Sequence, residues 1–207
     1  MAHCAEGREG RFDEKVSETD RNRWNDRYES GEYQGRTHPS ELIRNWHRIC
    51  NVGSALDLAC GIGRNSVYLA DQGFNVTGLD IADVAIDKAI QVHCNPSRNL
   101  RFQVMDLENA SIQDKYDLIV MFRYVNLDLL ERLVHNLNQD GVIMIEEHLV
   151  MPNPKDFAGP KSLDFRVESG TLRKHLGALR ILHEFEGPTH DPDGQRVALS
   201  QLVARKI

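Results

Sequence analysis

The sequence has no long apolar run and no excess of positive charge. No stretch of about 18 apolar residues occurs, so no membrane-spanning helix is predicted. The first 20 residues are polar, so we expect no secretory signal there. The formal net charge is −6, which argues against a surface that binds nucleic acid or an anionic membrane.

Cysteine is scarce, and potential metal ligands are scattered. The chain has 4 cysteines and 9 histidines, and neither type recurs at the spacing of a metal site, so no metal is expected. Reduced thiols are the simplest interpretation of these cysteines, and they predict a cytoplasmic protein. A chain of 207 residues is long enough for one α/β domain with a sizeable core.

From Ser54 onward, apolar segments that predict strands alternate with amphipathic segments that predict helices. This alternation is typical of a doubly wound, mostly parallel sheet. The last two predicted strands, Arg180–Glu186 and Arg196–Arg205, flank a stretch rich in turn residues, which predicts an antiparallel hairpin. The predicted fold class is therefore α/β: a Rossmann-like, seven-stranded sheet that ends in an antiparallel hairpin. The other predicted strands are 54–59, 75–80, 100–105, 116–122 and 141–149, and the predicted core helices are 65–72, 84–92, 127–137 and 167–176.

The segment before this core has a different character. Residues 1–16 are mostly small, polar or charged, and we expect a flexible tail there. A helix predicted from about Glu18 carries Trp24 and Tyr28 on one face, and a second helix begins near Pro39. We therefore expect a single domain over 17–207, with N-terminal lid helices over 17–50 and a core over 54–207.

The most informative motif is Leu56-Asp57-Leu58-Ala59-Cys60-Gly61-Ile62-Gly63. An apolar run ends in an acid and leads into a glycine-rich turn and a helix start, which is typical of nucleotide-binding α/β domains. The two glycines allow the backbone to approach a ligand closely. Asp80 ends the second predicted strand, where an acid can accept both hydroxyls of a ribose. Asp106 follows the third, where a carboxylate can accept the exocyclic amine of adenine.

Asp57 distinguishes between two kinds of nucleotide site. A diphosphate above the glycine turn would be repelled by this acid, whereas a cofactor with a cationic amino-acid group would be attracted to it. Ser66 also stands where a dinucleotide fingerprint has its third glycine. Both residues favour the cationic cofactor.

From about Trp24 to its C-terminus, the chain resembles the class I S-adenosylmethionine-dependent methyltransferases. The resemblance rests on the 56–63 motif, on Val76-Thr77-Gly78-Leu79-Asp80-Ile81 and on Tyr116-Asp117-Leu118-Ile119-Val120. Within the class, residues 57–65 and the upstream Trp24-Asn25-x-Arg27-Tyr28 are most similar to the tellurite-resistance and thiopurine-type small-molecule branch.

This resemblance implies S-adenosyl-L-methionine as the cofactor and a small molecule as the methyl acceptor. It assigns cofactor contacts to Arg27, Tyr28, Asp57, Ala59, Gly61, Gly63, Asp80, Ile81, Asp106, Leu107 and Phe122. Acceptor groups are expected at the carboxyl ends of strands, so the catalytic candidates are Arg123, Glu147 and His148. Arg123 could bind an anionic acceptor, and Glu147 or His148 could act as a base if the acceptor must lose a proton.

Three other interpretations stay open. Methylation of nucleic acid or protein is one, although Phe122-Arg123-Tyr124-Val125 stands where many nucleic-acid amino-methylating enzymes have Asp/Asn-Pro-Pro-Tyr. A nicotinamide-dependent oxidoreductase shares the glycine turn and Asp80, but Asp57, Ser66 and the terminal hairpin argue against it. A non-catalytic S-adenosylmethionine-binding protein would carry the same binding motifs.

Overall fold

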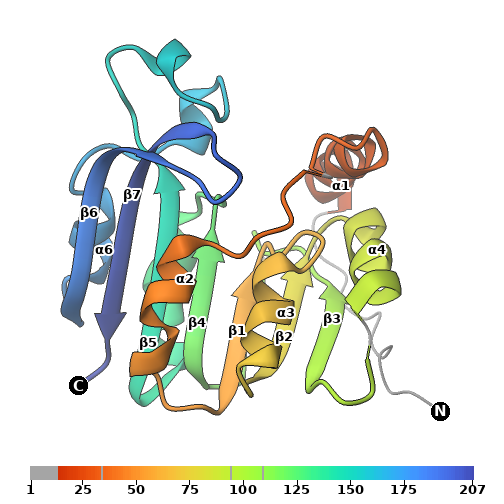
Figure 1. The fold of residues 1–207 in the computed structure, drawn as a ribbon, viewed down its shortest axis with the longest axis vertical. Coiled ribbons are helices and arrows are strands. Elements are labelled where there is room, and N and C mark those ends of the chain that lie inside the picture. Colours follow the sequence, from red (N-terminus) through yellow and green to blue (C-terminus); the bar gives the residue numbers. More distant parts are fainter. Residues whose placement is uncertain (1–13, 34, 94, 109) are drawn as a thin grey trace.

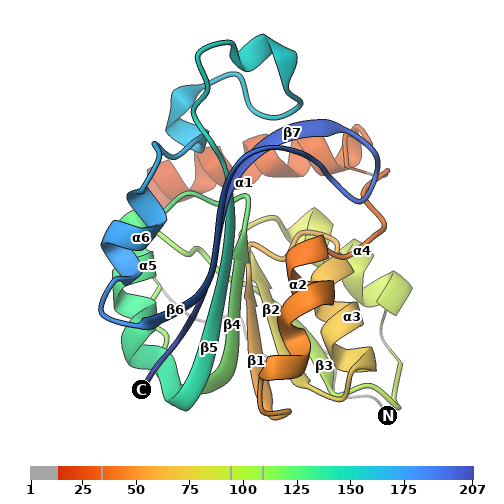
Figure 2. The ribbon, with the colours of Figure 1, turned by 60° about the vertical axis from the view of Figure 1, so that its left-hand side comes forward.

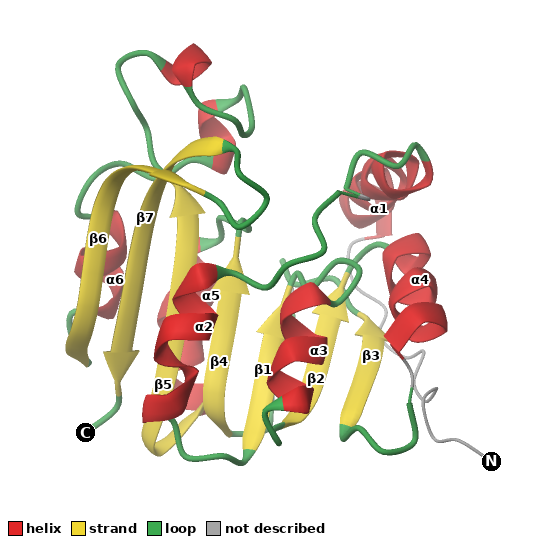
Figure 3. Ribbon diagram, viewed as in Figure 1, coloured by secondary structure: helices red, strands yellow, loops and turns green. Residues whose placement is uncertain are grey.

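A computed structural model describes residues 14–33, 35–93, 95–108 and 110–207. Its strands form one seven-stranded sheet in the order β3-β2-β1-β4-β5-β7-β6 (Figures 1 and 3). The strands are β1 (Ser54–Leu58), β2 (Asn75–Asp80), β3 (Leu100–Val104), β4 (Tyr116–Phe122), β5 (Leu137–His148), β6 (Arg180–His190) and β7 (Arg196–Arg205). Strands β1 to β5 pair in parallel, and β7 runs antiparallel to both of its neighbours. The predicted Rossmann-like sheet with a terminal antiparallel hairpin is confirmed.

Helices cover both faces of the sheet and its carboxyl edge. The helices are α1 (Glu14–Glu29), α2 (Glu41–Trp46), α3 (Arg64–Asp71), α4 (Asp83–His93), α5 (Leu127–Leu133) and α6 (Thr171–Leu176). Figure 2 shows α2 and α3 on one face, α5 and α6 on the other, and α1 lying across the top of the parallel strands. Ligands of open α/β sheets bind at this edge, so α1 lies where a lid is predicted. The other predicted lid helix, α2, instead packs on a face of the sheet, because Leu42 and Ile43 join the core there (Figure 2).

Two apolar cores hold these layers together, one on each face of the sheet. Leucines of α5 and α6 pack against alternate residues of β1, β4 and β5 in the first core. The second core contains the apolar faces of α2, α3 and α4. Strand β4 contributes to both cores, which explains why its sequence is nearly continuously apolar.

Several element boundaries differ from the prediction. Strand β5 begins at Leu137 rather than Gly141, because α5 ends at Leu133 and is followed by a single 3₁₀ turn. The helix predicted over 167–176 is confined to α6, and Val167 instead forms a bridge with Leu149. Strand β6 continues through Gly187 and Pro188, which a strand at the edge of a sheet tolerates.

The N-terminal boundary also differs. Helix α1 begins at Glu14, so 14–16 are helical rather than part of the predicted flexible tail. The rest of that predicted tail lies outside the described residues. Within the described part of the chain, no helix is both long enough and apolar enough to cross a bilayer.

Candidate active site

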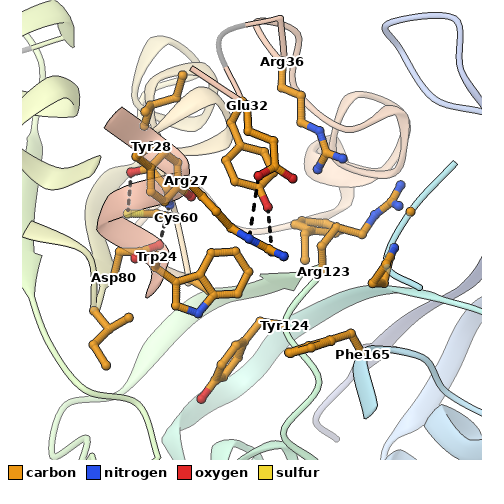
Figure 4. A pocket seen from close by; sticks show the side chains of 18 of the residues that line it. Trp24, Arg27, Tyr28, Glu32, Arg36, Cys60, Asp80, Arg123, Tyr124 and Phe165 are labelled. Carbon is orange, nitrogen blue, oxygen red and sulfur yellow. Dashed lines mark hydrogen bonds and ion pairs between the residues drawn. The ribbon is translucent and has the colours of Figure 1, made fainter. Parts of the chain in front are cut away.

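A cavity of about 970 Å³ lies at the carboxyl ends of the parallel strands. This volume is at the upper end of the range for small-molecule sites, roughly 300–1,000 Å³. Its walls come from α1 and the loop after it, the glycine turn after β1, the loops after β2, β3 and β4, residues 159–165, and the tip of the β6–β7 hairpin. Figure 4 shows side chains of α1 facing those of the β4 loop across this space.

The glycine turn is built around the Asp80 carboxylate at the end of β2. One oxygen accepts the backbone N–H of Gly61 at 2.8 Å, and the other accepts the N–H of Ala82 at 2.9 Å. Burial raises the pKa of this carboxyl, and the backbone N–H groups oppose the rise. Asp80 therefore both shapes the turn and lines the cavity.

Gly61 and Gly63 serve different purposes in this turn. Gly61 lines the cavity with φ +56°, and a Cβ there would lie 2.6 Å from the Tyr28 hydroxyl. Gly63 has φ +83°, and a Cβ there would collide with the Phe102 ring at 2.5 Å. Gly61 thus leaves space beside the lid, whereas Gly63 lets α3 pack closely on β3.

Asp57 lies in β1 and is almost completely buried, outside the residues that line the cavity. Ser66 Oγ donates a hydrogen bond of 2.5 Å to Asp57 Oδ2. Burial raises the pKa of Asp57 to about 7, while the hydrogen bond from Ser66 and the Arg64 cation lower it. Near neutral pH, this carboxyl is therefore close to its titration point.

Aromatic side chains of α1 and its following loop roof the cavity. Tyr28 and Tyr33 are 5.1 Å apart between ring centroids, and Trp24 and Tyr33 are 6.3 Å apart. The Arg27 guanidinium lies 5.1 Å from the centre of the Trp24 ring and donates to the Tyr33 hydroxyl at 3.3 Å. These contacts hold Arg27 in the cavity wall (Figure 4).

The lid is attached mainly to α4. Asn25 of α1 donates to the Asp83 carboxylate at 2.6 Å and accepts the N–H of Val84 at 3.2 Å. Lys88 Nζ donates to the backbone carbonyl of Tyr28. The lid therefore packs on α4, the helix that follows Asp80. These contacts connect α1, on one side of the cavity, to the turn that holds Asp80.

Arg123 follows β4 and is fixed by the end of β5. Its φ is +61°, an uncommon conformation for a residue other than glycine, and its N–H donates to the Glu146 carbonyl at 2.8 Å. Its side chain donates to Glu146 Oε1 from Nε at 3.1 Å and Nη2 at 3.0 Å, and Nη1 lies 2.8 Å from His148 Nε2. A guanidinium has five N–H donors, so donors remain available to a ligand.

Glu146 joins this arginine to the rest of the fold. Its Oε2 accepts Ser40 Oγ at 3.0 Å and Gln201 Nε2 at 2.6 Å. Ser40 is also the N-cap of α2, because its Oγ accepts the N–H of Leu42. The Arg123 side chain is therefore anchored to the linker after the lid and to β7.

His148 is held in its neutral form beside this arginine. Burial and the Arg123, Arg166 and Arg36 cations lower its pKa to about 2. The backbone of Gly159 packs against its ring, and a Cβ there would lie 2.5–3.0 Å from ring atoms. His148 thus accepts from Arg123 and supports the 159–165 loop.

Positive charge gathers at this end of the cavity. Arg36, Arg64, Arg123 and Lys161 line it. Burial and then the Arg123 cation lower the pKa of Arg64. Arg36 has no carboxylate partner among the described residues, and its guanidinium lies 5.2 Å from the centre of the Tyr33 ring. Mutual repulsion of this kind favours the binding of an anion.

Glu147 points away from the cavity, on the opposite face of β5 from Glu146 and His148. Its Oε1 accepts the N–H of Tyr124 at 3.1 Å, and its buried Oε2 has no hydrogen-bond partner among the described residues. Burial raises the pKa of Glu147 to about 8. This carboxyl therefore holds the loop after β4 and does not line the cavity.

The Glu147 pKa predicts a pH-dependent stability. Between its ordinary value of 4.5 and about 8, the unfolded chain has lost the proton that the folded chain retains, so stability falls as pH rises. We expect Glu147→Gln to remove this loss. Between about pH 5 and pH 8, the unfolding free energy of the variant should shift relative to wild type by on the order of 2 kcal/mol in favour of the variant.

Urea unfolding at several pH values measures this difference. Glu186→Gln is the matched control, because hydrogen bonds from Ser169, Gly170 and Ser200 lower the pKa of Glu186 against the effect of burial. Because Glu186 is therefore ionised in both the folded and the unfolded chain above about pH 5, the stability of Glu186→Gln relative to wild type should change little between pH 5 and pH 8. Wild-type and Glu147→Gln stabilities that change in parallel with pH would contradict the prediction.

The cavity brings together most of the residues that the sequence singled out. The predicted residues that line it are Arg27, Tyr28, Ala59, Gly61, Asp80, Ile81, Asp106, Leu107, Phe122, Arg123 and His148. Asp57, Gly63 and Glu147 do not line it.

Sequence reasoning missed several lining residues, among them Glu108, Phe165, Asp193 and Gln195. Glu108 accepts hydrogen bonds from Tyr124 and Asn126 and so holds the β4 loop. Its position two residues after Asp106 was an available signal. The sequence of the hairpin tip predicts a turn, but it does not indicate that the turn lies beside the cavity in the folded protein. In the described part of the chain, no group of three or more His, Cys, Asp or Glu side chains is placed to hold a metal ion.

The sheet order, the terminal hairpin and the glycine turn beside an acid-lined cavity define the fold of the class I S-adenosylmethionine-dependent methyltransferases. Residues 19–199 match the family described as tellurite resistance protein TehB. The chain belongs to this family.

Known relatives agree with this assignment. The chain is 27% identical over 172 residues to a probable S-adenosyl-L-methionine-dependent methyltransferase TehB of Haemophilus influenzae, covering 77% of this chain and 59% of the relative. The crystal structure of TehB from that organism has a TM-score of 0.69 at 23% identity, covering 80% of this chain and 61% of that one. A TehB-like methyltransferase from Corynebacterium glutamicum has a TM-score of 0.53 at 24% identity, covering 89% and 97%. The chain thus spans about three fifths of the length of the H. influenzae relative.

Proposed function

We propose that this protein transfers a methyl group from S-adenosylmethionine to a small anionic acceptor. The observation that carries the proposal is one cavity with two chemically different ends. Asp80 lies on one side of it and Arg36 and Arg123 lie on the other (Figure 4), and Arg64 lies near enough to these two arginines for their charges to add to the effect of burial in lowering its pKa. The described free cysteines, Cys50 and Cys60, are buried, which is consistent with a cytoplasmic location.

The residues at the first end suit the cofactor. Backbone N–H groups after β1 and β2 occupy part of the hydrogen-bonding capacity of the Asp80 carboxylate, but its two oxygens offer about four lone-pair sites, so it can still accept a ribose hydroxyl. Asp106 lines the cavity where an adenine amine would donate. S-adenosylmethionine supplies a methyl group on a cationic sulfur, and transfer removes that charge. The protein's main task is therefore to align the two molecules and exclude water.

The residues at the second end suit an oxyanion or a carboxylate. Arg123 is held by Glu146 and His148 before any ligand arrives, so little ordering is needed on binding. Tellurite, the compound in the family's description, is an oxyanion of this kind. A polymeric acceptor fits less well, because it would have to pass α1 and the tip of the β6–β7 hairpin, which both contribute walls to the cavity.

Calorimetric titration with S-adenosylmethionine, S-adenosylhomocysteine and NADH tests the cofactor. We expect both adenosyl ligands to bind and NADH to fail. Formation of S-adenosylhomocysteine in the presence of tellurite then tests the transfer. Binding of NADH alone would overturn the proposal in favour of an oxidoreductase, and adenosyl binding without turnover on any anion would favour a non-catalytic binding protein.

Asp57 predicts a pH dependence for cofactor binding. Its pKa of about 7 means that its negative charge grows between about pH 6 and pH 8, and a nearby cationic ligand binds better to the charged form. We expect wild-type affinity for S-adenosylmethionine to rise several-fold over this range relative to Asp57→Asn. Titration of the ligand itself affects both proteins equally, so it cancels in the ratio of their affinities. A ratio that does not change with pH would contradict this role.

A further inference from the structure

One acid stands among the cations at the acceptor end of the cavity. Asp193 lies at the tip of the β6–β7 hairpin, which bends over the carboxyl edge of the sheet (Figure 1). The tip is held by Asp191 Oδ1, which accepts the N–H groups of Asp193 at 3.1 Å and Gln195 at 2.8 Å. Gly194 completes the turn with φ +82°. The turn therefore fixes Asp193 in the cavity wall.

The Asp193 carboxylate is only half satisfied. Its Oδ1 accepts from His38 Nδ1 at 3.0 Å. Its Oδ2 is buried and has no hydrogen-bond partner among the described residues, and Arg64 Nη1 lies 3.9 Å away. The same Arg64 nitrogen donates to the carbonyl of His38 at 2.9 Å. Buried acceptors are nearly always paired, so this oxygen indicates a missing donor.

We propose that Asp193 selects methyl acceptors that carry a hydrogen-bond donor as well as an anionic oxygen. The inference rests on the proposed function, because the arginines supply the site for the anionic oxygen. An oxyanion that retains a proton can place its O–H on Asp193 Oδ2 and its charged oxygens on Arg123 and Arg36. A fully deprotonated anion leaves Oδ2 unpaired and meets it as a like charge, which is selection by repulsion.

Phosphate and sulfate are suitable probes, because they have the same shape but differ in protonation. At about pH 6, inorganic phosphate retains a proton and sulfate does not. Each is titrated calorimetrically into the protein saturated with S-adenosylhomocysteine. We expect wild type to bind phosphate about tenfold or more tightly than sulfate. In Asp193→Asn, the amide removes the like charge and can donate, so the two affinities should lie within about threefold of each other.

Two further variants make each outcome informative. Asp191→Asn is the matched control on the same turn, because asparagine caps such turns as well as aspartate does, and it should keep the wild-type ratio. Arg123→Gly should weaken both anions. Equal binding of the two anions to wild type, or an unchanged ratio in Asp193→Asn, overturns the role of Asp193 and leaves the anion site intact. Failure of both anions and of tellurite to bind wild type overturns the anionic acceptor itself.

Discussion

Replacing Gly61 by valine is expected to reduce the affinity for S-adenosylmethionine by more than about 100-fold. Gly61 has φ +56°, and its Cβ would lie 2.6 Å from the Tyr28 hydroxyl. A β-branched residue is strained in this conformation, and its methyl groups would enter the space between the glycine turn and the lid. The change also disturbs the N–H that donates to Asp80. Calorimetry with S-adenosylmethionine and S-adenosylhomocysteine measures the loss.

Gly170→Val is the matched control for this variant. Gly170 has φ +79°, and no atom lies within 4 Å of its ideal Cβ position. Both variants therefore carry the backbone strain, but only Gly61→Val fills the cavity. We expect both to lose stability and only Gly61→Val to lose cofactor affinity. Equal cofactor affinity in the two folded variants would show that the glycine turn does not contact the ligand.

The floor of the cavity could be predicted from the sequence because parallel strands end at a common edge. Once β1, β2 and β4 are recognised, Gly61, Asp80 and Phe122 must lie close together, and they line one cavity. Each of these residues ends or closely follows a strand in the sequence, so its position at the carboxyl end of that strand can be inferred without knowing the rest of the fold. The same reasoning placed Arg123 correctly after β4.

The faces of β5 and the position of the hairpin tip could not be predicted in the same way. Alternation along a strand implies that Glu146 and His148 share a face and that Glu147 lies on the other. Which of these faces meets the cavity depends on the helices packed against each side. Asp193 reaches the cavity only because β6 continues to His190 and bends over the edge of the sheet. The sequence around Asp193 predicts a turn, but it does not predict which residues this turn contacts.

Replacing Arg123 by glycine should strongly weaken acceptor binding while leaving the cofactor site unchanged. Glycine tolerates the φ of +61° that Arg123 adopts, so the backbone of the β4 loop is not strained by the change. The bond from the residue 123 N–H to the Glu146 carbonyl can persist. Glu146 keeps its hydrogen bonds from Ser40 and Gln201, which limits the cost of removing its cationic partner.

We expect kcat/KM for tellurite to fall at least about 100-fold, or on the order of 3 kcal/mol, with affinity for S-adenosylhomocysteine changed less than about threefold. Arg123→Lys should recover only part of the loss, because an ammonium cannot donate to Glu146, His148 and the anion in the same planar arrangement. Steady-state kinetics with separately varied tellurite and S-adenosylmethionine distinguish the two sites. A glycine variant with unchanged kinetics for tellurite would place the acceptor away from Arg123, and an equal loss of cofactor affinity would mean that Arg123 acts on the whole cavity rather than on the anion.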